Sequence, residues 1–160
     1  MRRLFKNANG EKVDEISYSL DILKKNPYTK IYVGADSQKR RKTIEYAVAI
    51  VYRYGHKGCH VIYTKWNVRR RGYGRGDALV EKRLQEEIAA TMEIAYRLKE
   101  HSISVYQVDF DLNNDSKWKS NKFVTLAQGW AKSLGFKVAI KPDELCAAKA
   151  ADHIANEKKI

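Results

Sequence analysis

The spacing of apolar residues along the chain predicts one helix, then three strands, in its first half. Residues 11–25 repeat apolar side chains at helical intervals, and Asn26-Pro27 ends the run. Three later runs have the short apolar or alternating pattern of β-strands: residues 30–36, 43–53 and 59–66. Only short polar or glycine-containing turns separate them, so we expect an antiparallel meander.

The second half of the chain alternates between helical and strand patterns. The spacing predicts helices over residues 77–99, 120–134 and 143–158, with strands over 103–111 and 136–140. We expect Asp77 and Asp143 to cap the helices that they begin. The element order predicts an α/β fold in which helices flank a mixed five-stranded sheet.

No linker or internal repeat interrupts these patterns, and 160 residues suffice for one compact core. We therefore expect a single domain over residues 1–160, with residues 1–29 as an N-terminal helical extension. The chain has no apolar run long enough to span a membrane, no secretory signal pattern, and only two cysteines. These features favour a cytoplasmic protein.

Acidic residues fall at the ends of two predicted strands. Asp36 ends the first strand, and Asp109 and Asp111 end the fourth, two residues apart and therefore on one face. If these strands are parallel neighbours, their carboxyl ends meet at one edge of the sheet, where such sheets bind ligands. Glu87 lies beside the apolar stripe of the long helix, whereas its neighbour Glu86 has the position of a solvated surface acid.

Several carboxylates held together repel one another unless a proton or a cation lies between them. Oxygen ligands of this kind suit Mg²⁺ or Mn²⁺, and two such ions can support hydrolysis of a phosphodiester bond. The chain has no Gly-Lys-Ser or Gly-Lys-Thr phosphate loop, and its histidines lack the spacing of a zinc site.

The positive charge is confined to the first half of the chain. The whole protein has a net charge of +12; residues 1–75 hold 18 basic and 6 acidic side chains, and the remaining residues are balanced. Such a field attracts polyanions, so the charge predicts a nucleic-acid partner, RNA or DNA. The glycine-containing segment 69–76 carries the candidate contacts with phosphates and bases: Arg69, Arg70, Arg71, Tyr73 and Arg75.

The spacing of two acids resembles bacterial ribonuclease H. There too a helical Glu lies 22 positions before a strand Asp, as Glu87 lies before Asp109, and a segment like Leu98-Lys99-Glu100-His101 ends the helix. Asp143-Glu144-Leu145 resembles the start of that enzyme's last helix, whose first Asp is the fourth metal-site carboxylate. This resemblance implies a ribonuclease H-like fold with Asp143 as the fourth acid.

A longer resemblance, over about residues 5–155, is to the uncharacterised YkuK-like family, a ribonuclease H-like group. The matching segments are Gly34-Ala35-Asp36-Ser37-Gln38, Leu84-Gln85-Glu86-Glu87-Ile88, Asp109-Phe110-Asp111-Leu112-Asn113 and Lys141-Pro142-Asp143. The family keeps an Asp-hydrophobe-Asn signature that falls on Asp111, so Asp111 ranks ahead of Asp109. The fourth acid stays open between Asp143 and Asp152, which lie too far apart along a helix to serve one centre.

Two functions follow from these features. The first is a metal-dependent nuclease in which Asp36, Glu87 and Asp111 hold Mg²⁺ or Mn²⁺, assisted by Asp109 and Asp143. The alternative is a non-catalytic nucleic-acid-binding module with the same fold. The sequence does not distinguish RNA from DNA or hybrid substrates, nor endonucleolytic from exonucleolytic cleavage.

Overall fold

A computed structural model describes residues 3–55, 58–113, 123–141, 143 and 145–156. Its helices are α1 (Glu15–Lys25), α2 (Asp77–Glu100), α3 (Val124–Ser133) and α4 (Cys146–Asn156). Its strands are β1 (Phe5–Lys6), β2 (Lys12–Val13), β3 (Lys30–Lys39), β4 (Thr43–Arg53), β5 (Cys59–Arg69), β6 (Gln107–Asn113) and β7 (Val138–Lys141). None of the helices in these ranges is long and apolar enough to cross a membrane.

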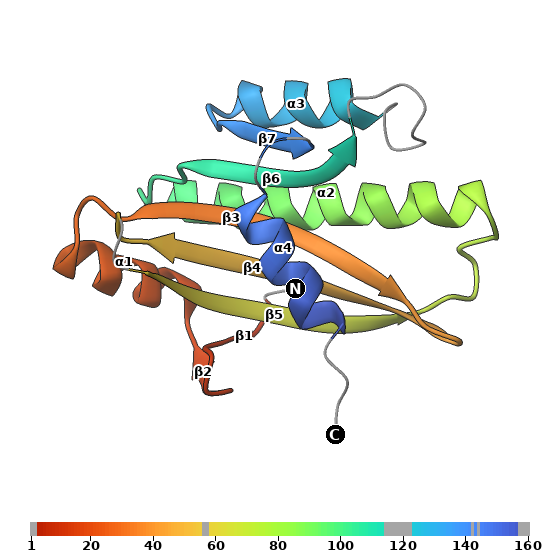
Figure 1. Ribbon diagram of the computed structural model, residues 1–160, viewed down its shortest axis with the longest axis horizontal. Helices are drawn as coiled ribbons and strands as arrows, with labels where there is room; N and C mark the ends of the chain where they lie inside the picture. The colour runs from red at the N-terminus through yellow and green to blue at the C-terminus, as the bar shows by residue number, and fades with distance from the viewer. Residues whose placement is uncertain (1–2, 56–57, 114–122, 142, 144, 157–160) are drawn as a thin grey trace.

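The strands form one mixed sheet in the order β2-β1-β5-β4-β3-β6-β7 (Figure 1). The predicted α/β architecture is therefore confirmed, but the expected five-stranded sheet is wrong, because the described chain forms seven strands. The additional strands, β1 and β2, have two residues each and add to the free edge of β5 through the pair Lys6 and Tyr63. A two-residue strand leaves no periodicity in the sequence, so the pattern could not predict them.

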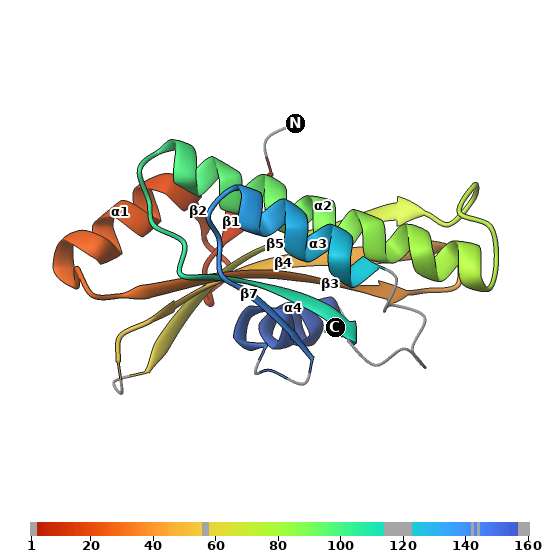
Figure 2. The same cartoon turned by 90° about the horizontal axis from the view of Figure 1, so that it is seen from above.

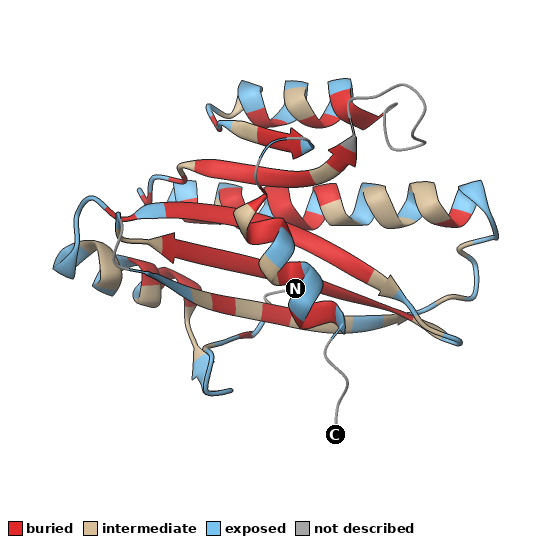
Figure 3. Cartoon of the chain, in the orientation of Figure 1, coloured by how far each residue is buried: buried red, intermediate tan, exposed pale blue. Residues whose placement is uncertain are grey.

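Helices cover both faces of the sheet. Figure 2 shows α1, α2 and α3 on one face and α4 alone on the other. The larger core lies under α2, where Val33 of β3 and Phe110 of β6 pack with Ile88 and Leu98. The smaller core joins β4 to α4 mainly through small side chains, and Figure 3 shows that β3 and β4 are buried along most of their length.

The strands β3 and β6 are parallel neighbours in the sheet, which is the condition that the predicted acidic site required. Their pairing runs from Tyr32 and Gln107 to Gly34 and Asp109 and does not continue to their carboxyl ends. Beyond Gly34, β3 stays paired with β4, and β6 resumes pairing with β7 at Asn113. The strands β3 and β6 are therefore no longer paired with each other where the predicted acidic residues lie.

Gly34 allows α4 to approach the sheet closely. A Cβ atom at this position would lie 2.6 Å from the amide nitrogen of Ala148 and 2.9 Å from the carbonyl carbon of Ala147. Backbone atoms cannot yield as a flexible side chain can, so any larger residue would push α4 outward. Gly34 thus fixes the height of α4 above β3.

Some predicted boundaries differ from those in the structure. The N-cap of α2 is Gly76 rather than Asp77, and α4 begins at Cys146, three residues after the expected cap Asp143. The first part of the predicted helix 11–25 is instead β2, and Asp14 caps α1 by accepting from the Ser17 amide. The predicted start of the helix at 120, and the end of the last helix at 158, lie outside the described residues.

Candidate functional site

Asp36 lies among a group of acidic side chains where β3 and β6 are no longer paired with each other. The predicted strand end at Asp36 is wrong, because β3 continues to Lys39 through its pairing with β4. It points to the same face of the sheet as its cross-strand partner Ala47, which packs against α4. Its side chain is 8% exposed. Burial raises the pKa of Asp36 to about 7, and the neighbouring carboxyl group of Asp152 adds to the increase. Asp36 therefore keeps its proton to a higher pH than an ordinary aspartic acid.

Glu87 approaches Asp36 from the opposite side of the sheet. It is the eleventh residue of α2, which covers the larger core, and it reaches Asp36 where β3 and β6 are unpaired. Burial raises the pKa of Glu87 well above its ordinary value, and the negative charge of Asp36 raises it further. Because the two carboxyl groups lie near each other, the protonated form of Glu87 is favoured while no cation is bound.

Asp152 completes the group from α4, a position that the sequence left open. Its side chain lies near enough to Asp36 to raise the pKa of that carboxyl, and its Oδ1 accepts from Gln38 Nε2 at 3.2 Å and from Asn156 Nδ2 at 2.8 Å. Asp152 and Asp143 lie too far apart along the chain to belong to one site, but that separation did not show which of them lies near Asp36. Asp152 does, because α4 crosses β3 at the close approach permitted by Gly34.

Asp111 belongs to the same group but is paired with a lysine. Its Oδ1 lies 2.7 Å from Lys141 Nζ, and its negative charge raises the pKa of Glu87. The hydrogen bond to Asp111 raises the pKa of Lys141, to which the charges of Asp36 and Asp152 also contribute. The ammonium group of Lys141 therefore pairs with Asp111, while the other two acids favour its charged form from a greater distance.

Asp109 has a different environment from Asp111, although both face α4. It is fully buried, and its Oδ2 accepts from the amides of Ala147 at 2.6 Å and Ala148 at 3.4 Å, while its Oδ1 accepts from Gln107 Nε2 at 2.7 Å. These amides are in the first turn of α4, where a negative charge is stabilised by the helix dipole. Asp109 thus performs the capping role that the sequence assigned to Asp143, and its lone pairs are committed to this role.

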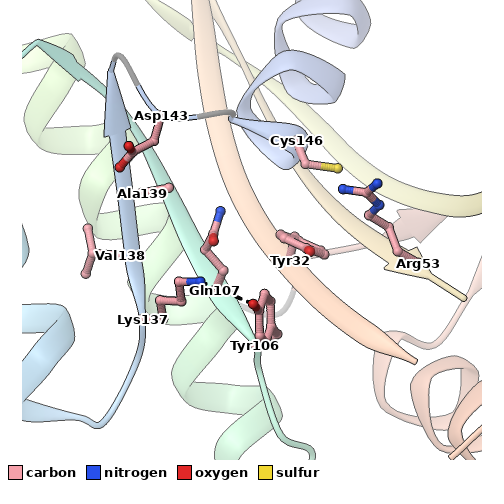
Figure 4. Close-up of a pocket in the computed structure, with 9 residues that line it drawn as sticks. All are labelled: Tyr32, Arg53, Tyr106, Gln107, Lys137, Val138, Ala139, Asp143 and Cys146. Atoms are coloured by element: carbon pink, nitrogen blue, oxygen red, sulfur yellow. Dashed lines mark hydrogen bonds between the residues drawn. The ribbon is translucent and has the colours of Figure 1, made fainter. Parts of the chain in front are cut away.

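Asp143 lies apart from the acidic group. It is exposed and lines a cavity of about 310 Å³ between β6, β7 and the start of α4 (Figure 4). The other residues that line this cavity are Tyr32, Arg53, Tyr106, Gln107, Lys137, Val138, Ala139 and Cys146. Asp143 was predicted to join the other acids, but the structure places it apart from them, whereas Asp152 lies near Asp36.

The C-terminal end of α4 is held by two cations. Arg40 Nη2 donates to the carbonyl of Ala155 at 2.7 Å, and Lys65 Nζ donates to the carbonyl of Ile154 at 3.0 Å. Both cations also pair with the buried carboxylate of Glu45, at 3.3 Å and 3.0 Å. Cations at a helix C-terminus satisfy its last carbonyls and oppose its dipole. Together with Asp109, these contacts fix α4 at both ends, with Asp152 between them.

Arg83 supports the group from α2, one turn before Glu87. Its Nε donates to Ser37 Oγ at 3.0 Å and its Nη2 to the Ser37 carbonyl at 2.8 Å. Its positive charge lowers the pKa of Glu87, opposing the effect of burial. Arg83 therefore ties α2 to β3 next to Asp36, and sequence periodicity provided no signal for it.

The basic segment 69–76 separates into anchoring and exposed side chains. Arg70 Nη1 donates to the carbonyls of Arg40 and Arg41 at 3.1 Å and 3.3 Å, which joins this segment to the turn between β3 and β4. The Tyr73 hydroxyl is hydrogen-bonded to that of Tyr46 at 3.2 Å, and Lys82 lies over the Tyr73 ring. The three remaining predicted contacts, Arg69, Arg71 and Arg75, are exposed.

The donor chemistry of the acidic group fits Mg²⁺ or Mn²⁺, since Asp36, Glu87, Asp111 and Asp152 offer only carboxylate oxygens. The raised pKa values of Asp36 and Glu87 indicate negative charge that a cation would relieve. Within the described ranges, however, no three acidic, histidine or cysteine side chains are close enough together to form a ready-made metal site. In this structure Asp111 is paired with the positive charge of Lys141. The four acidic side chains would therefore have to move before they could bind a metal ion together.

A model of the ribonuclease H-like family matches residues 11–156, which is most of the chain, so the protein belongs to this family. Within the family the match is to the YkuK-like group, which the sequence resemblance had suggested. No curated protein matches the chain.

Proposed function

We propose that the protein is a metal-dependent nuclease that hydrolyses phosphodiester bonds in RNA, DNA or RNA/DNA hybrids. The observation that carries this proposal is that four acids from four elements lie near enough to alter one another's pKa or that of Lys141: Asp36 from β3, Glu87 from α2, Asp111 from β6 and Asp152 from α4. Holding acids near one another costs stability, and such a cost is typical of functional sites.

Asp36 and Glu87 would be the central ligands of Mg²⁺ or Mn²⁺, with Asp111 and Asp152 on either side. When bound, the cation supplies Lewis acidity toward a phosphate oxygen and lowers the pKa of a bound water. Gln38 would orient Asp152 through its hydrogen bond, and Arg83, which donates to Ser37, would hold β3 in place next to Asp36. The exposed arginines of segment 69–76 would bind phosphates and hold the substrate in place without regard to sequence.

Lys141 would act as a stand-in charge for the cation. It pairs with Asp111 in the absence of metal, and a divalent ion must displace it to gain all four acids. Lys141→Met should therefore raise the affinity for Mn²⁺ in calorimetry, whereas Lys149→Met, on the exposed side of α4, should leave it unchanged. Equal affinities in the two variants would contradict this role of Lys141.

A non-catalytic binding module is the second candidate. The pairing of Lys141 with Asp111, and the lack of a ready-made metal group among the described residues, favour it. A cleavage assay with Mg²⁺ and with Mn²⁺, over single-stranded, duplex and hybrid substrates, distinguishes the two. The nuclease predicts cleavage that requires the metal and is lost in Asp36→Asn. A purified protein that binds these substrates and cleaves none of them would favour the module.

A further inference from the structure

The cavity that contains Asp143 combines positive charge with aromatic rings. Arg53 of β4 and Lys137, next to β7, contribute cations to its lining, and Asp143 is the single acid among the nine residues that form it. In Figure 4, Tyr106 and Lys137 point toward each other, and Arg53 lies across the cavity, beside Cys146. Lys30 adds a third positive charge at the rim, because its Nζ lies 4.4 Å from the centre of the Tyr106 ring.

The two tyrosines hold these cations in position. Lys137 Nζ donates to the Tyr106 hydroxyl at 3.1 Å and lies 4.8 Å from the centre of its ring. Tyr106 packs edge-on against Tyr32, whose ring lies 5.9 Å from the guanidinium carbon of Arg53. Contact with Lys137 lowers the pKa of Tyr106, which indicates a positive potential at the cavity mouth. Cations placed in advance by cation–π contacts lose little side-chain entropy when an anion binds.

We propose that this cavity binds the phosphate group of a nucleotide, with Arg53 and Lys137 as its counter-charges. A guanidinium group can donate two hydrogen bonds to a phosphate, and an ammonium group adds a point charge. A cavity of about 310 Å³ exceeds the size of a bare phosphate ion and lies in the range of small-molecule sites. The remaining space, bordered by Tyr32, Tyr106 and Val138, accommodates part of a sugar or a base.

This phosphate site is distinct from the acidic group. Tyr32 and Asp36 lie on the same face of β3, four residues and therefore about 13 Å apart. The ligand is either a free mononucleotide or one phosphate of a bound strand, and the chemistry of recognition is the same for both. The site does not depend on the proposed hydrolysis, so it can be tested with EDTA present.

The test is a titration of the ¹⁵N-labelled protein with inorganic phosphate and with AMP, in EDTA and at constant ionic strength. We expect saturable shifts at the amides of Arg53, Tyr106 and Lys137, with AMP binding more tightly than inorganic phosphate. Arg53→Gln and Lys137→Gln should each weaken AMP binding roughly tenfold, because each removes one charged hydrogen bond. Lys132→Gln, which removes an exposed charge from α3, should leave the affinity unchanged.

A short oligonucleotide without terminal phosphates shows whether the bound phosphate belongs to a nucleic-acid strand or to a free mononucleotide. If it shifts the same amides and competes with AMP, the phosphate belongs to a strand; if only AMP shifts them, the ligand is a free nucleotide. Either result supports the site. Shifts that spread without saturation over Arg40–Lys42 and Arg69–Arg71, or equal affinities in Arg53→Gln, Lys137→Gln and Lys132→Gln, would overturn it. Thermal melts of each variant verify that the fold is retained.

Discussion

Asp152 on α4 raises the pKa of Asp36 on β3, although the two acids lie far apart along the chain. Two carboxyl groups near each other favour a proton or a cation between them. Bringing these two acids together therefore costs free energy, and this cost depends on pH and on cations. Both dependences can be measured without knowledge of the substrate.

Asp36→Asn should change the pH dependence of stability. The pKa of Asp36 is raised to about 7 in the folded protein, so the folded state binds more protons than the unfolded state between about pH 4 and pH 7. The wild-type free energy of unfolding should therefore fall as pH rises through this window, by at most about 1.4 kcal/mol per pH unit from this group. Urea denaturation from pH 4 to pH 8 measures the slope.

Asparagine does not titrate, so Asp36→Asn should flatten this slope and be more stable than wild type at pH 8 in EDTA. Adding millimolar Mn²⁺ should stabilise wild type by mass action, by about 2.7 kcal/mol at a hundredfold excess over Kd, and the variant much less. A variant with the wild-type pH slope would show that Asp36 is not the group that binds the proton.

Glu87→Gln and Glu86→Gln form a matched pair one residue apart on α2. Glu87 faces Asp36, whereas Glu86 is rotated by about 100° and is exposed. Under the proposed function, Glu87→Gln should abolish cleavage and weaken Mn²⁺ binding at least tenfold, while Glu86→Gln should be nearly silent. Both should bind nucleic acid as wild type does. Equal cleavage rates for the two purified variants would remove Glu87 from the site.

Asp109 should behave as a helix cap and not as a metal ligand. Asp109→Ala leaves the Ala147 amide and Gln107 without their acceptor and should lower the free energy of unfolding by about 1–3 kcal/mol. Asp109→Asn retains an acceptor oxygen and should be less destabilising. Calorimetry with Mn²⁺ on the folded Asp109→Asn protein decides between the roles, since loss of a ligand would abolish binding while leaving stability nearly intact.

The exposed arginines of segment 69–76 should carry the salt dependence of nucleic-acid binding. The triple change of Arg69, Arg71 and Arg75 to Ala should weaken binding to all sequences alike and flatten the plot of log affinity against log salt. The slope should fall by about 0.7–0.9 for each phosphate that the variant no longer neutralises.

Arg70→Ala serves as the comparison, because Arg70 donates to the carbonyls of Arg40 and Arg41. It should lower thermal stability, with a smaller effect on the salt slope than the triple change. Fluorescence anisotropy at several salt concentrations measures both slopes. An unaltered slope in the triple variant would place the phosphate contacts elsewhere on the protein.

The sequence predicted the elements that are long and periodic. A period of two residues predicted the strands that contain Asp36 and Asp111, and a period of 3.6 residues predicted the helix that contains Glu87. Each of these elements spans ten residues or is bounded by clear turn signals. The pairing of β1 with β5 through Lys6 and Tyr63 involves single residues, which leave no periodic trace.

The acidic group was only partly predictable. Spacing places Asp109 and Asp111 on one face, but it does not reveal which of them lies beneath the first turn of α4. The choice between Asp143 and Asp152 stayed open for the same reason, because the closeness of Asp152 to Asp36 depends on where α4 crosses β3. That crossing is fixed by Gly34 and by the contacts of Asp109 and Glu45, which join segments far apart in the chain.

Because α4 follows every strand of the sheet in the sequence, it is synthesised after all of them. The ribosome synthesises β3, β4 and β5 first, and these strands can pair through short turns while α4 does not yet exist. During that interval Asp109 lacks the two amides that it later binds, and the small residues of β4 are open to water. Docking of α4 then closes this face and brings Asp152 to Asp36 in the same event. A nascent chain thus brings Asp152 to the other three acids only after α4 has been made.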